Sequence, residues 1–371
     1  MRILLLSCNT GGGHNSAAAA ISAHFSERGI ACDTHDALLF VSKAHSDILS
    51  NGHFFVYRHF PNLFGVGYRF EENHQPRFLY NQMALGAKKF AAFLEENTYD
   101  AIICTHIFGN MLVTEARRKF NVTVPHYVVT TDYTMHPGTD MVDAERFFIA
   151  AEQLKPLLVE AGIPEERVVA SGIPIAPGFM KTSDKQTARR NLGLPEDGKM
   201  VLLSSGSIGC GQLDRVAPEL EARLPADCNL IVLCGHNKKM YKQLQENGGS
   251  RTTAVDFTTR VAEYMAAADL CITKPGGLST TEMLATGLPM VLMLTVPGCE
   301  TRNLEFFREL GVAVGTDDWD EAIQLTVDLI NDDARLAEMH EKLLAAGYPG
   351  GATVIADTVL ADIAAKENAH D

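Results

Sequence analysis

Short apolar runs alternate with helix-forming segments along the whole chain, and this alternation limits the possible folds more than any other feature. In the first half, apolar runs of strand length lie at residues 2–8, 30–36, 100–105 and 126–131. The pattern begins again in the second half, with runs at residues 200–205, 229–234, 253–257 and 270–273. Apolar strands that alternate with helices pair in parallel, and the helices cover both faces of the sheet. The chain is therefore predicted to be α/β, with two open parallel sheets in succession.

The length of the chain agrees with two domains. A chain of 371 residues is longer than one core of ordinary size needs. The segment 172–178 is rich in glycine and proline, and the alternation pauses there. We therefore expect a Rossmann-like domain over residues 1–177 and a second one over residues 178–345. The last segment, 346–371, is predicted to form a helix that packs back toward the N-terminal domain.

Composition narrows the class of protein. The net charge of −14 argues against general binding of nucleic acid. No apolar run reaches the roughly 18–20 residues that cross a bilayer, and the apolar N-terminus runs into a glycine loop instead of a cleavage site. The eight cysteines form no CxxC pair, which favours a reduced cytosol and argues against a zinc site.

Glycine-rich loops follow three of the predicted strands, at Asn9–His14, Ser204–Gly211 and Lys274–Glu282. Glycines at a strand-to-helix turn let the backbone approach a phosphate, and the helix N-terminus favours negative charge. Each of the first two loops alone is also explained by a tight turn. Three such loops at the strand ends of two sheets together predict a site for a nucleotide diphosphate. Glu282 lies one turn into the helix that follows the third loop, where its carboxylate can accept hydrogen bonds from a diol such as a ribose.

Three polar side chains of the first half are candidates for proton transfer. His14 begins a helix, where the dipole disfavours the imidazolium, so a neutral ring can act as general base or donate to a phosphate. Asp132 and His136 follow the strand at 126–131 and are expected to point into a cleft between the two domains. The Asp132 carboxylate would then deprotonate an acceptor or orient His14; the alternative is that it only caps a helix.

The segment 54–70 holds seven aromatic residues interleaved with arginine and histidine. Among them are Phe54, Phe55, Tyr57, Arg58, Phe64 and Tyr68. One interpretation is an amphipathic surface that enters a lipid headgroup layer and receives a lipid acceptor. The other interpretation, equally weighted, is that many of these rings fill the core.

Several motifs, in this order, carry a family likeness: Thr10–His14 followed by Ser16–Ala19, Thr131–Tyr133 with His136, Gly172–Ile175, Lys274–Glu282, and Pro297–Glu300. They resemble the monogalactosyldiacylglycerol synthase and processive diacylglycerol β-glucosyltransferase group over nearly the whole chain. That group shares a glycosyltransferase family with the peptidoglycan N-acetylglucosaminyl transferase. The resemblance implies a GT-B fold, in which two Rossmann-like domains face across a cleft, and an inverting enzyme of bacterial glycolipid biosynthesis. It implies no cofactor and no metal.

The resemblance also implies roles for individual residues. The C-terminal domain would bind the UDP-sugar and the N-terminal domain the acceptor. Glu282 would bind the ribose hydroxyls, and Phe257 and Thr258 the uracil. Against the diphosphate would lie Gly206, Ser207, Lys274, Gly276, Gly277, Ser279 and Thr280. Glu300 and Asn303 would touch the hexose. His14 would lie near the diphosphate and the acceptor, with Gly12, Gly13, His136 and the 54–70 segment on the acceptor side.

The expected reaction is a single displacement by an acceptor hydroxyl on a UDP-hexose, with His14 or Asp132 as the base. The acceptor is expected to be diacylglycerol at the inner face of the cell membrane, to which a cytoplasmic protein would bind peripherally, with anionic lipids. Cys299 stands where the family has glutamine, so glucose, galactose and N-acetylglucosamine all stay open. The alternatives are a UDP-N-acetylglucosamine transferase with another lipid-linked acceptor, and a UDP-N-acetylglucosamine 2-epimerase.

Overall fold

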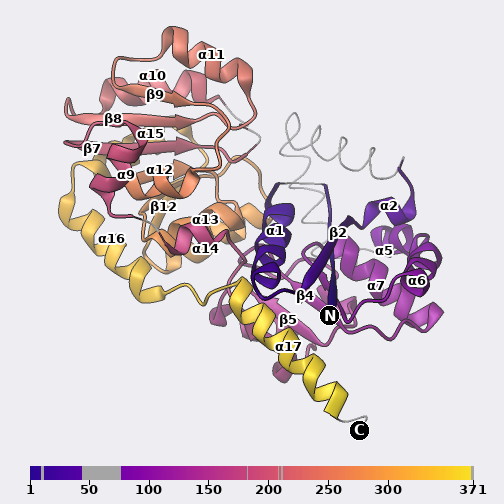
Figure 1. The fold of residues 1–371 in the computed structure, drawn as a ribbon. Coiled ribbons are helices and arrows are strands. Elements are labelled where there is room, and N and C mark those ends of the chain that lie inside the picture. Colours follow the sequence, from indigo (N-terminus) through magenta and orange to yellow (C-terminus); the bar gives the residue numbers. More distant parts are fainter. Residues whose placement is uncertain (10–11, 44–76, 182, 208, 210–211, 369–371) are drawn as a thin grey trace. The chain divides into compact units, whose positions relative to one another are not determined.

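The computed structural model describes residues 1–9, 12–43, 77–181, 183–207, 209 and 212–368. The chain divides into two compact units (Figure 1). Unit 1 comprises Met1–Ala176 together with Pro349–Asp371, and unit 2 comprises Pro177–Tyr348. These boundaries lie within a few residues of the segment ends expected from the sequence.

Unit 1 contains, among its described residues, a parallel sheet of six strands in the order β2-β1-β3-β4-β5-β6. The strands are β1 (Arg2–Ser7), β2 (Ala31–Asp36), β3 (Ala101–Cys104), β4 (His126–Val129), β5 (Arg146–Ile149) and β6 (Val168–Ala170). The α-helices are α1 (Gly12–Glu27), α2 (Leu38–Val41), α5 (Arg77–Ala84), α6 (Ala87–Glu96), α7 (Ile107–Phe120), α8 (Lys155–Glu160) and α17 (Ala352–Asn368). Short 3₁₀ turns are η1 (Thr139–Met141), η2 (Glu152–Leu154) and η3 (Glu165–Arg167).

Alternate side chains of β1 pack into two separate cores, because successive side chains of a strand point to opposite faces of the sheet. Leu4 and Leu6 are fully buried against α5, α6 and α7 on one face of the sheet. Ile3 and Leu5 are fully buried on the other face, against α1 and α17. A strand that is apolar on both sides is therefore explained by helices on both faces.

Unit 2 has a second parallel sheet, whose six described strands run in the order β12-β11-β10-β7-β8-β9. The strands are β7 (Lys199–Ser204), β8 (Cys228–Leu233), β9 (Thr252–Val255), β10 (Leu270–Thr273), β11 (Met290–Met293) and β12 (Ala313–Thr316). The helices are η4 (Pro177–Met180), α9 (Lys185–Leu192), α10 (Leu213–Arg223), α11 (Lys238–Asn247), α12 (Val261–Ala267), α13 (Gly277–Thr286), α14 (Cys299–Glu309), α15 (Trp319–Ile330) and α16 (Asp333–Ala346). This order is the Rossmann arrangement, which agrees with the expectation of a Rossmann-like second domain.

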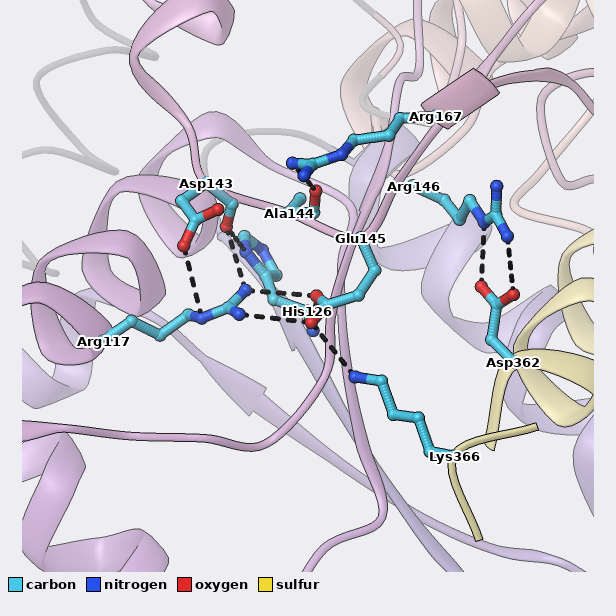
Figure 2. A network of polar contacts seen from close by, with 9 residues as sticks. All are labelled: Arg117, His126, Asp143, Ala144, Glu145, Arg146, Arg167, Asp362 and Lys366. Carbon is cyan, nitrogen blue, oxygen red and sulfur yellow. Dashed lines mark hydrogen bonds and ion pairs between the residues drawn. The ribbon is translucent and has the colours of Figure 1, made fainter. Parts of the chain in front are cut away.

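The last helix, α17, returns to unit 1 after the chain has passed through unit 2, and it packs against α1 (Figure 1). Ion pairs join it to the end of the sheet at which strands β4 and β5 begin (Figure 2). Within the described part of the chain, no helix combines the length and the apolar character needed to cross a membrane.

Candidate active site

The site in unit 1 begins where the sheet changes direction, between β1 and β3. Ligands of open α/β sheets bind at such a switch point, beside the carboxyl ends of the strands. His14 stands in the first turn of α1, directly after the loop that follows β1. Its Nδ1 atom lies 2.9 Å from the carbonyl oxygen of Thr105, the residue that follows β3. The Thr105 hydroxyl in turn donates to the His14 carbonyl at 3.1 Å, so the two loops hold each other.

The contacts of His14 fix which ring nitrogen carries the proton. A carbonyl oxygen can only accept, so Nδ1 must be the protonated nitrogen that faces Thr105. The hydroxyl oxygen of Thr131, beyond β4, also lies 2.9 Å from Nδ1 and shares this proton. In the neutral ring Nε2 then keeps its lone pair and is the atom that can accept a proton. Burial lowers the pKa of His14 to about 4, although the bond to Thr105 opposes this shift, so the ring is neutral near pH 7.

A second histidine, His106, supports the first and was missed by the sequence analysis. Its ring meets that of His14 edge to face, with centroids 4.4 Å apart. Its own Nδ1 accepts the backbone N–H of Phe108 at 3.1 Å and thereby caps the N-terminus of α7. The signal in the sequence was a histidine directly after a predicted strand, the same placement that drew attention to Asp132.

Asp132 and His136 lie in the loop after β4, and His136 interacts electrostatically with both Asp132 and His14. Burial lowers the pKa of His136; the Asp132 carboxylate opposes that shift, and a positive charge on His14 would add to it. The next helical turn, η1, has Gly138 as its N-cap, so helix capping does not explain Asp132. Gly12 and Gly13 form the first turn of α1 beside His14. The predicted acceptor residues Phe54, Phe55, Tyr57, Arg58, Phe64 and Tyr68 lie outside the described residues.

In unit 2 the sheet also changes direction, between β7 and β10, and the two glycine loops predicted to bind phosphate lie there. Lys274 follows β10, and its Nζ atom lies 2.5 Å from Oε1 of Glu300. A Cβ atom built on Gly206 would lie 3.6 Å from the Lys274 side chain, and one on Gly276 would lie 3.2 Å from its Nζ. The switch point thus gathers a partly buried ammonium, a carboxylate, and two stretches of backbone with no side chain in the way.

Helix α13 begins at Gly277, which like its N-cap Gly276 brings no side chain to the first turn. Thr280 differs from the prediction that it would lie against a diphosphate. It is fully buried, and its hydroxyl donates to the carbonyls of Gly276 and Gly277 at 3.0 Å each. Ser279 lies in the same first turn and is partly exposed.

Asn303 also differs from its prediction. The side chain is fully buried, and its amide donates to the carbonyl of Pro275 at 2.9 Å. It therefore positions the loop that carries Lys274, whereas the prediction had it touch a hexose. Glu300, one turn earlier in α14, is 9% exposed and acts on the same loop through Lys274.

Glu282 projects from the second turn of α13. Burial raises the pKa of its carboxyl to about 8, so the group is protonated at neutral pH. A buried carboxyl gains most from a ligand that supplies hydrogen-bond donors to it, because these stabilise the ionised form. Two adjacent hydroxyls would meet that need.

An aromatic pair lies beyond the phosphate loop. Phe257 follows β9, is 47% exposed, and stacks on His236 with centroids 4.0 Å apart and planes inclined by 14°. The His236 backbone N–H donates to the Ser207 carbonyl at 2.9 Å, so the turn after β8 holds the turn after β7. Thr258 accepts the backbone N–H of Arg260 through its hydroxyl at 3.0 Å. His236 was not predicted, although it too follows directly on a strand and a glycine.

The described residues contain no group of three or more histidine, cysteine, aspartate or glutamate side chains that could hold a metal ion. None of the described cysteines is part of a disulfide bond. The expectation that the enzyme needs no metal and no cofactor stays a prediction.

Comparison with known proteins agrees with this two-unit arrangement. Residues 14–175 match the family described as monogalactosyldiacylglycerol (MGDG) synthase, and residues 200–340 match the glycosyltransferase family 28 C-terminal domain. A processive diacylglycerol β-glucosyltransferase of Bacillus mycoides is 27% identical over 99% of this chain and 95% of its own length. A second protein of that name, from Staphylococcus carnosus, is 29% identical over 71% of this chain and 68% of its own length.

Solved structures show the fold. MurG of Acinetobacter baumannii superposes with a TM-score of 0.65 at 15% identity, covering 97% of this chain and 99% of that one. HepE of Anabaena, solved with UDP-glucose, superposes with a TM-score of 0.58 at 16% identity, covering 98% of this chain and 100% of that one. The predicted GT-B architecture is confirmed at the level of two parallel-sheet units. The chain is a glycosyltransferase whose first unit matches the monogalactosyldiacylglycerol synthase family and whose second unit matches the glycosyltransferase family 28 C-terminal domain, and it is similar over its full length to processive diacylglycerol β-glucosyltransferases.

Proposed function

We propose that this enzyme transfers a hexose from UDP-glucose or UDP-galactose to diacylglycerol, with inversion, and forms a β-glycosyl diacylglycerol. The observation that carries the proposal is the fixed tautomer of His14, which leaves a basic Nε2 at the switch point of unit 1. The family supports the acceptor, since the relatives are named diacylglycerol glucosyltransferases. A neighbour of the same fold, HepE, binds UDP-glucose and so supports the donor.

The chemistry requires a base and a way to stabilise the leaving group. His14 Nε2 takes the proton of the acceptor hydroxyl while the oxygen of that hydroxyl attacks the anomeric carbon of the UDP-hexose. The bond from that carbon to the UDP oxygen breaks, and UDP leaves with the electron pair. Backbone N–H groups after Gly206 and Gly277 stabilise its charge, together with Lys274. Each such donor typically lowers the barrier by about 2.7–4 kcal/mol. Asp132 is the alternative base.

The donor contacts divide among the loops of unit 2. Glu282 takes the ribose hydroxyls, and Phe257 with Thr258 takes the uracil. Gly276, Gly277, Ser279 and Ser207 lie against the diphosphate, and Glu300 meets the hexose while it holds Lys274. No metal and no cofactor takes part. The acceptor is met at the inner face of the cell membrane, where the cytoplasmic enzyme binds peripherally to a surface that contains anionic lipids.

The test is an incubation with each of UDP-glucose, UDP-galactose and UDP-N-acetylglucosamine and with diacylglycerol in vesicles that contain phosphatidylglycerol. We expect a β-glycosyl diacylglycerol from a UDP-hexose, detected by mass spectrometry. Exclusive use of UDP-N-acetylglucosamine with another lipid would favour the alternative transferase. Conversion of the donor sugar without any acceptor would identify an epimerase instead. Absence of glycolipid together with full transfer to a soluble acceptor would end the lipid proposal.

A further inference from the structure

His106 contacts the proposed base but takes part in no step of the reaction described above. It follows β3, next to Thr105, whose carbonyl oxygen faces Nδ1 of His14. The rings of His106 and His14 meet edge to face, with centroids 4.4 Å apart and planes inclined by 78°. Because β3 pairs with β1, the turn that carries His106 lies beside the start of α1 at the same end of the sheet. His106 is therefore placed to act on His14 from a different element.

The contacts of His106 exclude it as a second base. Its Nδ1 accepts the backbone N–H of Phe108 at 3.1 Å, which caps the N-terminus of α7. This bond uses the lone pair of Nδ1, so in the neutral ring the proton lies on Nε2. A ring in this tautomer can donate a hydrogen bond but has no nitrogen left to take a proton. The proton of the acceptor hydroxyl therefore goes to His14, and any contribution of His106 comes from its contacts.

The start of α7 fixes the position of the His106 ring. The backbone of His106 is extended, with φ and ψ angles of −142° and 143°, as is usual for an N-cap residue. The Phe108 ring also packs against it, with centroids 4.6 Å apart. A Cβ atom on Gly109, in the first turn of α7, would lie 3.2 Å from both Cys104 Sγ and Leu6 Cβ. The first turn of α7 is thus held tightly against β1 and β3, and the His106 ring with it.

The hydrogen bonds of His14 do not by themselves fix the plane of its ring. Both partners, the Thr105 carbonyl and the Thr131 hydroxyl, meet the ring at one atom, Nδ1. Hydrogen bonds weaken steeply only below an angle of about 120°, so a ring held at one atom can still tilt. The His106 ring, packed nearly at a right angle to that of His14, opposes this tilt because the two rings would overlap. The direction of His14 Nε2 therefore depends on His106.

The same contact contributes to the burial of His14. Burial is the main cause of the low pKa of His14, and the bond to the Thr105 carbonyl opposes it. In the part of the chain that the structure describes, two elements bring titratable groups to His14. The start of α7 brings His106, and the loop after β4 brings His136, on which Asp132 also acts. Loss of the ring at position 106 would admit water to His14 and make its charged form less costly.

We propose that His106 is a positioning residue for the transfer, whose ring fixes the plane of the His14 ring and keeps Nε2 of His14 directed at the acceptor hydroxyl. The inference rests on the proposed function, in which His14 is the base, and adds to it a residue that does not touch the substrate. His106 takes no proton and forms no bond in the reaction. It acts on the rate through His14 alone.

Two substitutions separate the ring of His106 from its cap. His106→Asn keeps a side chain that caps helices well but removes the ring. His106→Phe keeps a ring that can make the edge-to-face contact but removes the capping acceptor. Each variant receives diacylglycerol in phosphatidylglycerol vesicles and UDP-glucose or UDP-galactose, whichever the wild type uses. We measure kcat and KM over a range of pH values, with thermal melting as the check on folding.

We expect His106→Asn to lower kcat by about tenfold to a hundredfold, the effect of misplacing a reacting group, and to change KM for the donor by less than about twofold. The acid limb of its pH–rate profile should move up toward the ordinary histidine pKa of 6.5, because water now reaches His14. Its melting temperature should stay near that of the wild type. If it melts early, His106→Ser is a second variant that keeps a cap and has no ring.

His106→Phe should restore most of the rate that His106→Asn loses, together with the wild-type pH profile. It should nevertheless melt about 2–4 °C below the wild type, because α7 has lost its cap. Rescue of the rate without rescue of stability would separate the positioning role from a merely structural one.

A double variant tests whether His106 acts through His14. In a His14→Ala background, His106→Asn should lower kcat by less than about twofold further, because the group that it positions is absent. Equal losses in His106→Asn and His106→Phe, no loss in either, or a full further loss in the double variant would overturn the positioning role alone. A wild-type enzyme that forms no glycolipid would overturn the proposed function instead.

Discussion

At the scale of single residues, His14 shows how much of a site a sequence can reveal. Its place after a strand and a glycine loop identified it, but its partners did not follow from the sequence. Thr105 and Thr131 are 91 and 117 residues away along the chain. They meet His14 because β3 pairs with β1 and β4 with β3. Strand order depends on packing between distant segments, so the tautomer of His14 became evident only in the fold.

The lowered pKa of His14 predicts the pH dependence of transfer. The folded-state pKa is about 4, below the ordinary value of 6.5, so the basic form persists as the pH falls through 6.5. We expect the rate to hold down to about pH 5 and to fall below it. His14→Ala should lower kcat by about 10²–10⁴-fold, the usual contribution of a general base. A pH–rate profile at saturating donor measures both, and full turnover by this variant would make Asp132 the base.

Glu282 predicts a different pH dependence, that of donor binding. Its pKa of about 8 means that the free enzyme must lose a proton before the carboxylate accepts two ribose hydroxyls. We therefore expect the affinity for UDP-glucose to rise about tenfold or more between pH 6 and pH 8, because the complex binds fewer protons. The stability of the free protein is expected to depend on pH in the opposite direction. The contribution of Glu282 to the free energy of unfolding is present below pH 4.5 and is lost as the pH rises through 8.

The matched variant for this prediction is Glu282→Gln. Its amide cannot ionise, so its affinity for UDP-glucose should be lower than that of the wild type at pH 8 and flat over the same range. Titration calorimetry of the two proteins at three pH values measures the difference. A wild-type affinity that does not change with pH would show that Glu282 does not bind the ribose as a carboxylate.

At the scale of elements, the strands were largely predictable and the way their loops lock together was not. Apolar runs of strand length gave the positions of β1, β7 and β10 to within about two residues. They did not show that the turn after β7 and the turn after β8 fit into each other. A Cβ atom on Gly209 would lie 2.1 Å from the Cys234 carbonyl oxygen, and one on Gly235 would lie 2.4 Å from the Ser207 carbonyl oxygen. Glycine permits such a close approach because it has no Cβ atom, but a glycine in the sequence does not show which distant backbone it will meet.

This interlock predicts that Gly235→Ala disturbs the donor site. The new methyl group would push the Ser207 carbonyl away, and the positive φ of 54° adds backbone strain. We expect destabilisation by about 1–3 kcal/mol and a clear loss of affinity for UDP-glucose. Gly193→Ala is the control, because Gly193 has a similar φ of 66° but nothing within 4 Å of its Cβ position. It should lower stability to a smaller extent and leave donor affinity unchanged, as thermal melting and calorimetry would show. If both variants bind the donor normally, the interlock does not support the site.

At the scale of the whole molecule, the path of the chain makes α17 part of unit 1 although it follows unit 2. A helix at the chain end was expected to pack back, but the ion pairs that hold it were not predictable. They join Asp362 and Lys366 to Arg146 and Glu145, residues more than 200 positions earlier in the chain. Figure 2 shows both pairs at the edge of the sheet, with Glu145 also bound to Arg117.

The pair between Arg146 and Asp362 is the strongest of these links. It is bidentate, with distances of 2.9 and 2.7 Å, and the Asp362 side chain is only 18% exposed. Asp362→Ala would leave a partly buried guanidinium without this partner. We therefore expect the free energy needed to detach α17 from the rest of unit 1 to fall by about 1–3 kcal/mol. The control is Asp357→Ala on the same helix. Asp357 pairs with Arg28 at 2.6 Å but is 59% exposed, and exposed pairs contribute about 0–1 kcal/mol.

Hydrogen exchange of residues 352–368 measures this directly, because detachment opens α17 before the rest of unit 1 unfolds. Asp362→Ala should speed exchange throughout the helix, whereas Asp357→Ala should leave it close to the wild-type rate. Raising the salt concentration should weaken the Asp357 pair first, since exposed charges are screened more than partly buried ones. Equal protection of α17 in both variants would mean that the apolar contact between α1 and α17, through residues such as Ile355 and Val359, is sufficient to hold the helix in place.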